Sequence, residues 1–302
     1  MGNNVVQRAR VTVRRPSANA RSRGMCEGDR SNRRGGRAME MLDVDGLRIA
    51  YERAGGGPPL ILLHGYVGDG PTTWRRQIDG LSDEFTVVAW DAPGAGRSSD
   101  SPESFGMAGY ADCLAGFVKA LGLEEPHVAG LSFGGALALT FYRRHSAIPT
   151  TLILASAYAG WAGSLPAEVA EQRLRQAFAL ADLSPQEFVD ALLPTMFSEG
   201  TPPESVGAFR ASMLALHPAG FRAMARASAE DLRDVLPHIR VPTLLLYGDK
   251  DVRAPLTVGE DLHAAISGSA LVVLPDAGHV CNVEAPEEFN SAVRNFLHDS
   301  HG

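Results

Sequence analysis

Short apolar runs alternate with longer amphipathic segments along most of the chain. Each run holds four to six residues rich in Val, Leu, Ile and Ala, as is typical of strands buried on both faces. The strand-like runs are 59–63, 85–90, 127–131, 151–154, 242–247 and 270–274, and helical spacing marks 73–81, 107–121, 136–142, 256–265 and 286–297. Strands that alternate with helices require a parallel sheet with right-handed crossovers. The turn signal Asp45-Gly46, between 41–44 and 47–51, predicts a hairpin before the first of them.

One long stretch interrupts this alternation. Between 156 and 229 no strand-like run occurs, and amphipathic segments follow one another at 167–181, 185–196, 204–216 and 219–227. We therefore predict an α/β fold with a mostly parallel central sheet flanked by helices. Residues 39–155 and 230–302 would form its core, and 156–229 an inserted helical cap. The simpler alternative is that these helices pack on the sheet like the others.

The first 38 residues lack apolar periodicity and contain ten arginines but only two acidic residues. Such a segment cannot bury enough apolar surface to offset its ordering entropy, so we expect 1–38 to be a disordered basic extension. Arg14-Arg15 resembles a twin-arginine signal, but no apolar segment follows it, so we expect no export. The alternatives are a transit peptide, a basic arm for an anionic surface, and translation that starts at Met39 or Met41.

Composition restricts the partners and cofactors of the remaining chain. Residues 39–302 hold 18 basic and 33 acidic residues, so nucleic-acid binding is not expected. No run of 18 apolar residues occurs, so no membrane span is expected. Three cysteines cannot form a closed disulfide framework, which favours a reducing, cytoplasmic compartment. The sequence has no clustered Cys and His, no H-E-x-x-H and no P-loop motif, so we expect neither a metal nor another cofactor.

The run 127–131 ends in a G-x-S-x-G motif, Gly130 to Gly134, between a predicted strand and a predicted helix. In so tight a turn, a side chain at Gly130 or Gly134 would collide with neighbouring backbone. The turn would hold Ser132 in a strained conformation, with its hydroxyl at the carboxyl end of the sheet. The alternative is an ordinary glycine-rich turn with an incidental serine.

A serine hydroxyl that acts as a nucleophile needs a base, and the base needs an acid that orients it. His279 follows the last predicted strand, and Asp251 follows the strand before it. Loops after parallel strands emerge at one edge of a sheet, so Ser132, Asp251 and His279 should converge there. Their order along the chain is the one expected for a serine nucleophile on such a scaffold.

The chain resembles serine hydrolases of the α/β-hydrolase fold, and is similar to enol-lactonases and carboxylesterases among them. The resemblance covers about 41–297 and rests on motifs in the expected order. They are His64-Gly65, Gly130-x-Ser132-x-Gly134, Gly248-Asp249-Lys250-Asp251 with Pro255, and Gly278-His279. The resemblance implies that Ser132 is the nucleophile and His279 the general base. Asp251 would be the acid, with Asp249 as the competing candidate.

The same resemblance implies that the backbone N–H groups of Tyr66 and Phe133 form the oxyanion hole. Such donors stabilise a transition state by about 3 kcal/mol each. His64 is expected to organise its loop, and Asp91 to hold backbone amides after its strand. Cys281 is expected to be a buried apolar residue, although it lies only two positions after the predicted base.

These residues predict a hydrolase that cleaves a small-molecule ester or lactone through an acyl-enzyme intermediate on Ser132. A carbon–carbon bond hydrolase and a cofactor-free haloperoxidase or perhydrolase would use the same triad. A ligand receptor with little turnover is the alternative from another class. The oligomeric state stays open, a homo-oligomer included.

The predicted cap should select the substrate. Arg173, Arg175 and Arg222 occur among its apolar residues and would give a pocket a cationic rim, which suits a carboxylate-bearing ester or lactone. A minority of the apolar candidates should face the substrate, and the rest should form the interior of the cap. These candidates are Leu180, Phe188, Leu192, Met196, Phe197, Phe209, Met213 and Met224.

Overall fold

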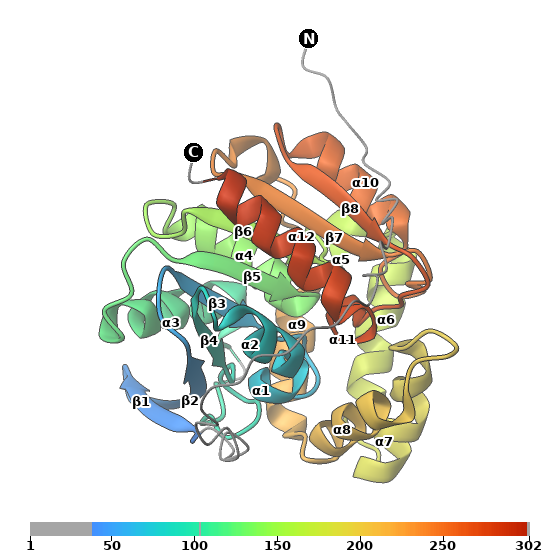
Figure 1. The fold of residues 1–302 in the computed structure, drawn as a ribbon. Helices are drawn as coiled ribbons and strands as arrows, with labels where there is room; N and C mark the ends of the chain where they lie inside the picture. Colours follow the sequence, from blue (N-terminus) through green and yellow to red (C-terminus); the bar gives the residue numbers. More distant parts are fainter. Residues whose placement is uncertain (1–37, 103, 301–302) are drawn as a thin grey trace, which may run out of the picture.

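The computed structural model describes residues 38–102 and 104–300, with an eight-stranded sheet at its centre (Figure 1). The strands lie in the order β1-β2-β4-β3-β5-β6-β7-β8. β1 (Glu40–Val44) and β2 (Leu47–Ala54) form the predicted hairpin, and β2 runs antiparallel to β4. The predicted parallel sheet is confirmed for the other strands. These are β3 (Pro59–Leu63), β4 (Thr86–Trp90), β5 (His127–Leu131), β6 (Thr151–Ala155), β7 (Thr243–Gly248) and β8 (Ala270–Leu274).

Helices cover both faces of the sheet (Figure 1). α2 (Arg75–Leu81) and α12 (Pro286–Asp299) pack together on one face. α3 (Gly106–Ala120) and α4 (Phe133–Arg144) pack together on the other, and α10 (Leu256–Ala265) packs on β7 and β8. Every residue of β4, β5, β6 and β7 is buried as a result. A strand buried on both faces needs a continuous apolar run, which is the pattern that the sequence shows.

The strand register brings the ends of the parallel strands to one edge. Leu63 at the end of β3 pairs with Gly130 in β5, and Leu131 at the end of β5 pairs with the last residue of β6. On the far side, Gly248 at the end of β7 pairs with Leu274 at the end of β8. The loops after β3, β5, β7 and β8 therefore emerge at the same edge, as the sequence predicts.

Only helices and turns lie between the end of β6 and residue 230, a stretch described throughout. We call residues 156–229 the helical insertion. Its helix α9 packs on α3 and α4, while α8 contacts α1 (Gly70–Thr73). The helices are α5 (Trp161–Ser164), α6 (Ala167–Leu180), α7 (Pro185–Leu192), α8 (Pro203–Leu214) and α9 (Pro218–Ser228). That this insertion acts as a cap stays a prediction.

Some helix boundaries differ from those predicted. The segment predicted at 73–81 is two helices that meet at Trp74. The segment predicted at 185–196 ends as α7 at Leu192 and continues as a short 3-10 turn, Leu193–Thr195. Pro194 inside that turn has no N–H to continue the α-helical hydrogen bonds. α5 and α11 (Cys281–Glu284) are too short for helical spacing to mark them.

Apart from Ala38, the predicted basic extension lies outside the described residues, and so does Arg14-Arg15. Within 38–102 and 104–300, no helix combines the length and hydropathy needed to cross a bilayer. The same residues contain no group of three or more His, Cys, Asp or Glu side chains arranged to hold a metal ion.

Candidate active site

Ser132 lies in the turn between β5 and α4, at the carboxyl edge of the sheet. Its backbone angles, φ 54° and ψ −110°, are strained for a residue with a side chain. A Cβ on Gly130 would lie 2.1 Å from the carbonyl oxygen of Gly134. A Cβ on Gly134 would lie 2.1 Å from the carbonyl oxygen of Leu63. The predicted steric requirement for both glycines is therefore confirmed.

Gly134→Ala should destabilise the protein, because the added methyl group would overlap the end of β3. We expect the free energy of unfolding to fall by about 3 kcal/mol, the upper part of the range for overpacking. Chemical denaturation would measure it. Gly207→Ala in α8 is the matched control, since a Cβ there meets nothing within 4 Å. Equal stabilities for the two variants would contradict the steric reading of the turn.

Ser132, His279 and Asp251 lie far apart in the sequence, but their side chains form one continuous set of hydrogen bonds. His279 Nε2 lies 3.0 Å from Ser132 Oγ. His279 Nδ1 lies 2.9 Å and 3.1 Å from the two carboxylate oxygens of Asp251. An ionised carboxylate can only accept, so Nδ1 carries the proton and donates it to Asp251. Nε2 is then left as an acceptor for the Ser132 hydroxyl.

The carboxylate of Asp251 is held by its own loop as well as by His279. The backbone N–H groups of Arg253 and Ala254 each donate to Asp251 Oδ1 at 2.8 Å. Burial raises the pKa of Asp251, while the charge and hydrogen bond of His279 lower it. With further hydrogen bonds from Ala254 and Ser156, the pKa is lowered below its ordinary value. Asp251 is therefore ionised at neutral pH.

Asp249, the competing acid, faces another way. Its Oδ1 accepts a hydrogen bond of 2.8 Å from the backbone N–H of Asp276, and its Oδ2 lies 3.5 Å from Lys250 Nζ. The contact with Asp276 ties the loop after β7 to the loop after β8, while Lys250 belongs to the same loop as Asp249. Of the two candidates, only Asp251 is in contact with His279.

The loop that carries His279 is fastened to the helical insertion. The backbone N–H of His279 donates to the carbonyl oxygen of Met196 at 3.0 Å, and that of Val280 donates to the same oxygen at 3.3 Å. Met196 follows the 3-10 turn of the insertion. The position of the histidine therefore depends on the backbone of the insertion.

Glu284 adds a second connection, which sequence reasoning missed. Its Oε1 accepts from the backbone N–H of Gly278 at 2.9 Å. Its Oε2 accepts from the backbone N–H and hydroxyl of Ser198 and from the hydroxyl of Thr201, at 2.8, 2.6 and 2.9 Å. One carboxylate thus joins the residue before His279 to the insertion. The sequence pattern gives no indication of this role. Ser198 and Thr201 lie more than 80 positions before Glu284, and Gly278 lies in a loop without regular spacing.

The predicted oxyanion donors are the backbone N–H groups of Tyr66 and Phe133, which belong to the loop after β3 and to the start of α4. Phe133 is the first residue of α4, where the helix dipole favours negative charge. Tyr66 follows Gly65, and a Cβ on Gly65 would lie only 3.9 Å from Ser132 Cβ. Neither N–H is paired with another backbone group within the described part of the chain. Neither group is thus used in a backbone hydrogen bond among these residues, and the prediction that they form the oxyanion hole stays a prediction.

His64 and Asp91 organise the loops around this site. The His64 ring lies 2.5 Å from the Gly65 carbonyl oxygen through Nδ1, and its Nε2 accepts from the backbone N–H of Ala92 at 2.9 Å. Burial lowers the pKa of His64, which keeps the ring neutral. Asp91 accepts from the backbone N–H groups of Gly70 and Arg97, and burial raises its pKa to about 6. The structural roles predicted for both residues agree with these contacts.

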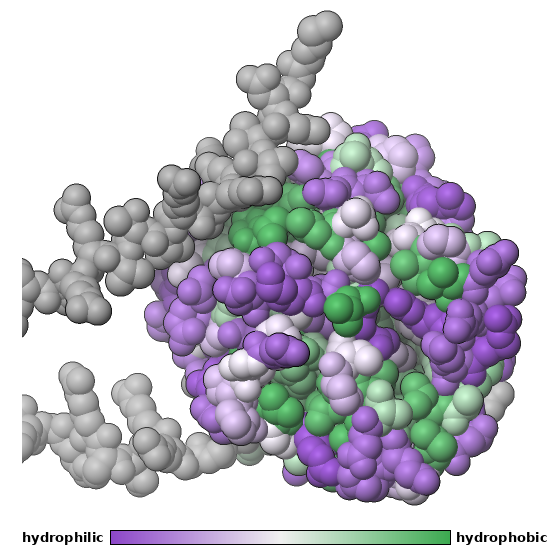
Figure 2. Space-filling view, turned by 90° about the vertical axis from the view of Figure 1, so that its right-hand side faces the viewer, coloured by the Kyte–Doolittle hydropathy of each residue, from purple (hydrophilic) through white to green (hydrophobic). Residues whose placement is uncertain are grey.

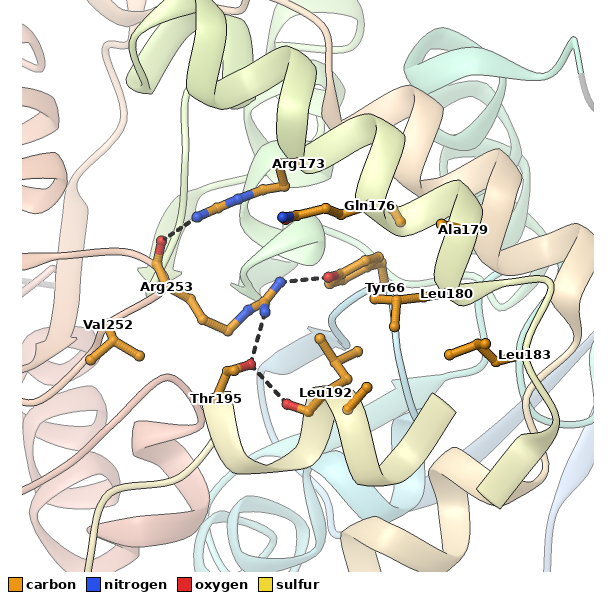
Figure 3. A pocket seen from close by; sticks show the side chains of 12 residues that line it. Tyr66, Arg173, Gln176, Ala179, Leu180, Leu183, Leu192, Thr195, Val252 and Arg253 are labelled. Carbon is orange, nitrogen blue, oxygen red and sulfur yellow. Dashed lines mark hydrogen bonds between the residues drawn. The ribbon is translucent and has the colours of Figure 1, made fainter. Parts of the chain in front are cut away.

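A cavity of about 540 Å³ lies between the helical insertion and the loop after Asp251 (Figure 3). Tyr66 contributes to its wall from the core, and Val252 and Arg253 contribute from the loop. The insertion contributes residues of α6 and α7, which are Arg173, Gln176, Ala177, Ala179, Leu180, Ala191 and Leu192, together with Leu183 and Thr195. Ser132, His279 and Asp251 are not among its lining residues, but Val252 and Arg253 directly follow Asp251 in the chain, so the cavity lies beside the loop that carries the acid.

Among the predicted lining residues, Leu180 and Leu192 border this cavity. Phe188, Met196, Phe209, Met213 and Met224 are buried in the hydrophobic core instead.

Of the predicted arginines, Arg173 borders the cavity. Arg175 and Arg222 form ion pairs with Glu171 and Asp182. Arg253 was missed, although its position two residues after Asp251 places it at the same sheet edge.

The face of the molecule on the side of α6 is hollowed near its middle, with apolar side chains among polar ones around the hollow (Figure 2). Two residues of the cavity wall are exposed large apolar residues, Val252 at 73% and Leu183 at 41%. Part of the cavity wall is therefore apolar and exposed to solvent.

Comparison with known proteins supports the same family. Residues 58–286 match the model of the alpha/beta hydrolase fold. A thermophilic esterase from Thermogutta terrifontis, solved with malate bound, is 32% identical with a TM-score of 0.80, over 88% of this chain and 100% of that one. The enol-lactonase from Burkholderia xenovorans is 27% identical with a TM-score of 0.77, over 86% and 100%. The AB hydrolase superfamily protein YisY of Bacillus subtilis is 31% identical over 82% of this chain and 94% of its own.

The family match spans most of the chain, and the fold has the sheet order and the strand–turn–helix serine described above. The predicted fold is confirmed. The chain belongs to the α/β hydrolase fold family and is a hydrolase.

Proposed function

We propose that this hydrolase cleaves a small-molecule ester or lactone through an acyl-enzyme intermediate on Ser132. The observation that carries the proposal is the hydrogen-bonded chain from Ser132 Oγ through His279 to Asp251, at 3.0 Å and 2.9 Å. This arrangement meets the geometric requirement for an activated serine, a base within hydrogen-bonding reach that a third group orients. The esterase and enol-lactonase relatives are named for the same kind of bond.

The first half of the reaction acylates the serine. The Ser132 hydroxyl passes its proton to His279 Nε2 while Oγ bonds to the substrate carbonyl carbon. Asp251 stabilises the imidazolium that forms, and it stays ionised because its pKa is lowered. The bond to the leaving oxygen then breaks, and that oxygen takes the proton from Nε2. In a lactone, the leaving oxygen remains attached to the acyl chain as a hydroxyl group.

Water completes the reaction. It gives a proton to His279 Nε2 while its oxygen bonds to the acyl carbon, and Ser132 leaves with the proton from Nε2. In both halves the negative charge of the tetrahedral intermediate lies on the former carbonyl oxygen. The backbone N–H groups of Tyr66 and Phe133 would donate to that oxygen. Donors that are fixed by the backbone would need no reorientation when the substrate arrives, which is the condition for electrostatic stabilisation of the transition state.

Cys281 is the other nucleophilic side chain near the base, two positions after His279. It is fully buried, and burial raises the pKa of its thiol to about 12. A thiol with this pKa stays protonated at neutral pH and is a poor nucleophile. The environment of Cys281 therefore supports Ser132 as the residue that is acylated.

The test combines turnover with covalent labelling. The purified protein would be assayed on a panel of esters, thioesters and lactones, then treated with a fluorophosphonate and digested for peptide mass analysis. We expect turnover of at least one ester or lactone and a single adduct on the peptide that contains Ser132. An adduct on another residue, or turnover that persists after complete labelling, would contradict the proposal.

Glu284→Gln should lower kcat on the order of 10- to 100-fold, because a small displacement of a catalytic group has such an effect. The amide nitrogen of glutamine would face N–H or O–H donors at Gly278, Ser198 or Thr201 and loosen the loop of His279. KM should change little, since Glu284 does not border the cavity.

The matched control for Glu284→Gln is Glu287→Gln, at an exposed position three residues later. It should keep the kcat of the unmodified enzyme. If Glu284→Gln instead raises KM with kcat unchanged, Glu284 does not position the base.

A further inference from the structure

Two guanidinium groups border the cavity, Arg173 from α6 and Arg253 from the loop after Asp251 (Figure 3). No Asp or Glu is among the described residues of the cavity wall. The protein as a whole is acidic, with a formal net charge of −7. The cavity wall is therefore positively charged, although the protein as a whole is negatively charged.

Arg253 crosses the cavity between the core and the insertion. Its Nη2 donates to the Tyr66 hydroxyl at 2.5 Å, and its Nη1 donates to Thr195 Oγ1 at 2.9 Å. Both acceptors are neutral oxygen atoms. The Nε–H group is buried and has no hydrogen-bond partner among the described residues. An unpaired buried donor costs about 1–3 kcal/mol, so the guanidinium would gain from a further acceptor.

Arg173 lies beside it and is also bound only to neutral oxygens. Its Nη1 donates to the Tyr158 hydroxyl at 2.8 Å, and its Nη2 donates to the backbone carbonyl oxygen of Arg253 at 3.1 Å. Its guanidinium carbon lies 5.4 Å from the centre of the Tyr158 ring and 5.7 Å from that of Trp161. The aromatic rings hold the cation in place without neutralising it. In Figure 3 the side-chain amide of Gln176 points toward the same part of the cavity.

We propose that Arg173 and Arg253 bind a carboxylate of the substrate, so that the preferred substrates are anionic half-esters or lactones with a terminal carboxylate. The inference rests on the proposed function of Ser132 and deepens it. Arginine suits this role because its planar, permanently charged group matches a carboxylate with paired hydrogen bonds.

Tyr66 sets the distance between the two ends of such a substrate. Its backbone N–H would hold the carbonyl oxygen at Ser132, while its side-chain hydroxyl touches Arg253. The carboxylate and the scissile carbonyl would therefore be separated by about the length of one tyrosine side chain. An acyl chain with a few methylene groups spans that length, whereas a carboxylate directly on the carbonyl does not.

The experiment compares two esters that differ in one group. Mono-4-nitrophenyl glutarate carries a carboxylate where 4-nitrophenyl pentanoate carries a methyl group. After subtraction of spontaneous hydrolysis, kcat/KM for the glutarate should exceed that for the pentanoate by about 10- to 100-fold, as expected for hydrogen bonds to a charged group. In Arg253→Leu the ratio should fall to near one, and in Arg173→Leu it should fall in the same direction.

Arg175→Leu is the matched control, because it removes the same charge from the same helix at an exposed side chain paired with Glu171. It should keep the preference for the glutarate. Arg253→Lys should keep part of this preference, since lysine keeps the positive charge but lacks the planar guanidinium group that pairs with a carboxylate. A wild-type preference for the pentanoate would overturn the inference. So would an unchanged ratio in Arg253→Leu, which would mean that Arg253 only fastens the insertion to the core.

A binding measurement separates this inference from the proposed function. Glutarate should bind the wild-type protein and raise its melting temperature, and Arg253→Leu should abolish that shift. If Ser132 is not the nucleophile, Ser132→Ala still cleaves the esters, but glutarate still raises the melting temperature of the wild type and not that of Arg253→Leu. If the enzyme cleaves the pentanoate and glutarate causes no shift, the arginine site is wrong while the role of Ser132 stands.

Discussion

Ser132→Ala is expected to lower kcat for ester hydrolysis by about 10⁵- to 10⁶-fold, because removal of the nucleophile abolishes the acyl-enzyme route. The hydroxyl that lies 3.0 Å from His279 Nε2 is lost, while the backbone donors remain. KM or inhibitor binding should change little, since the oxygen is a small part of the contact surface. The measurement is steady-state turnover of a chromogenic ester at high enzyme concentration.

Ser267→Ala is the control for this loss, since Ser267 is an exposed serine between α10 and β8. It should keep the full rate. Fluorophosphonate labelling should disappear in Ser132→Ala and persist in Ser267→Ala. Residual turnover above about 1% of wild type in a folded Ser132→Ala protein would exclude Ser132 as the nucleophile, given the loss expected for a missing triad serine.

Asp251→Asn is expected to lower kcat by about 10⁴-fold, the effect of losing the acid of such a triad. The amide nitrogen would donate toward His279 and favour the tautomer with the proton on Nε2. That nitrogen could then no longer accept the proton of Ser132. Asp249→Asn, which removes the competing acid, should lower kcat only a few-fold because Asp249 contacts Asp276 and Lys250. Comparable losses in the two variants would reject Asp251 as the orienting acid.

The same variant gives a pH test. Because the pKa of Asp251 is lowered on folding, its ionised form contributes stability that is fully present above its ordinary pKa of 3.8. This contribution is lost as the pH falls further, through the still lower value in the folded protein. Urea unfolding should therefore give a constant difference between wild type and Asp251→Asn at neutral and mildly acidic pH. The difference should shrink below about pH 4; one that widens there would mean that the carboxyl is not held as an anion.

The parts of the fold that the sequence predicts are those with a local steric or hydrophobic cause. Strands buried on both faces must be apolar throughout, so the apolar runs predict the bounds of β3 and β5 to the residue. The bounds of β8, a partly buried edge strand, are also predicted by its apolar run. Gly130 and Gly134 mark the serine turn because a Cβ on Gly130 would overlap the start of α4, and a Cβ on Gly134 would overlap the end of β3. The parallel sheet then brings the loops with Asp251 and His279 to Ser132 without any further information.

The parts that the sequence could not predict depend on which side chains meet across the molecule. Arg253 reaches Tyr66 over a separation of 187 positions, and Glu284 reaches Ser198 over 86. The sequence does not distinguish the three arginines predicted near the pocket. In the structure, Arg175 and Arg222 form ion pairs with Glu171 and Asp182. Only the orientation of α6 leaves Arg173 facing the cavity. Which arginine faces the cavity depends on how the helices pack, and the spacing of residues along the sequence does not predict that packing.

The hydrogen bond from the His279 N–H to the Met196 carbonyl has a consequence for protein engineering. Because the acceptor is a main-chain oxygen, the hydrogen bond does not depend on the side chain at position 196, and Met196 is constrained only by its buried place in the hydrophobic core. The length of the segment is constrained more strictly. A deletion or insertion between Leu192 and Ser198 would move the oxygen away from the base, whatever residues it used. Chimeras that exchange this helical segment between relatives should therefore keep activity only when the spacing from α7 to the Ser198–Glu284 contact is preserved.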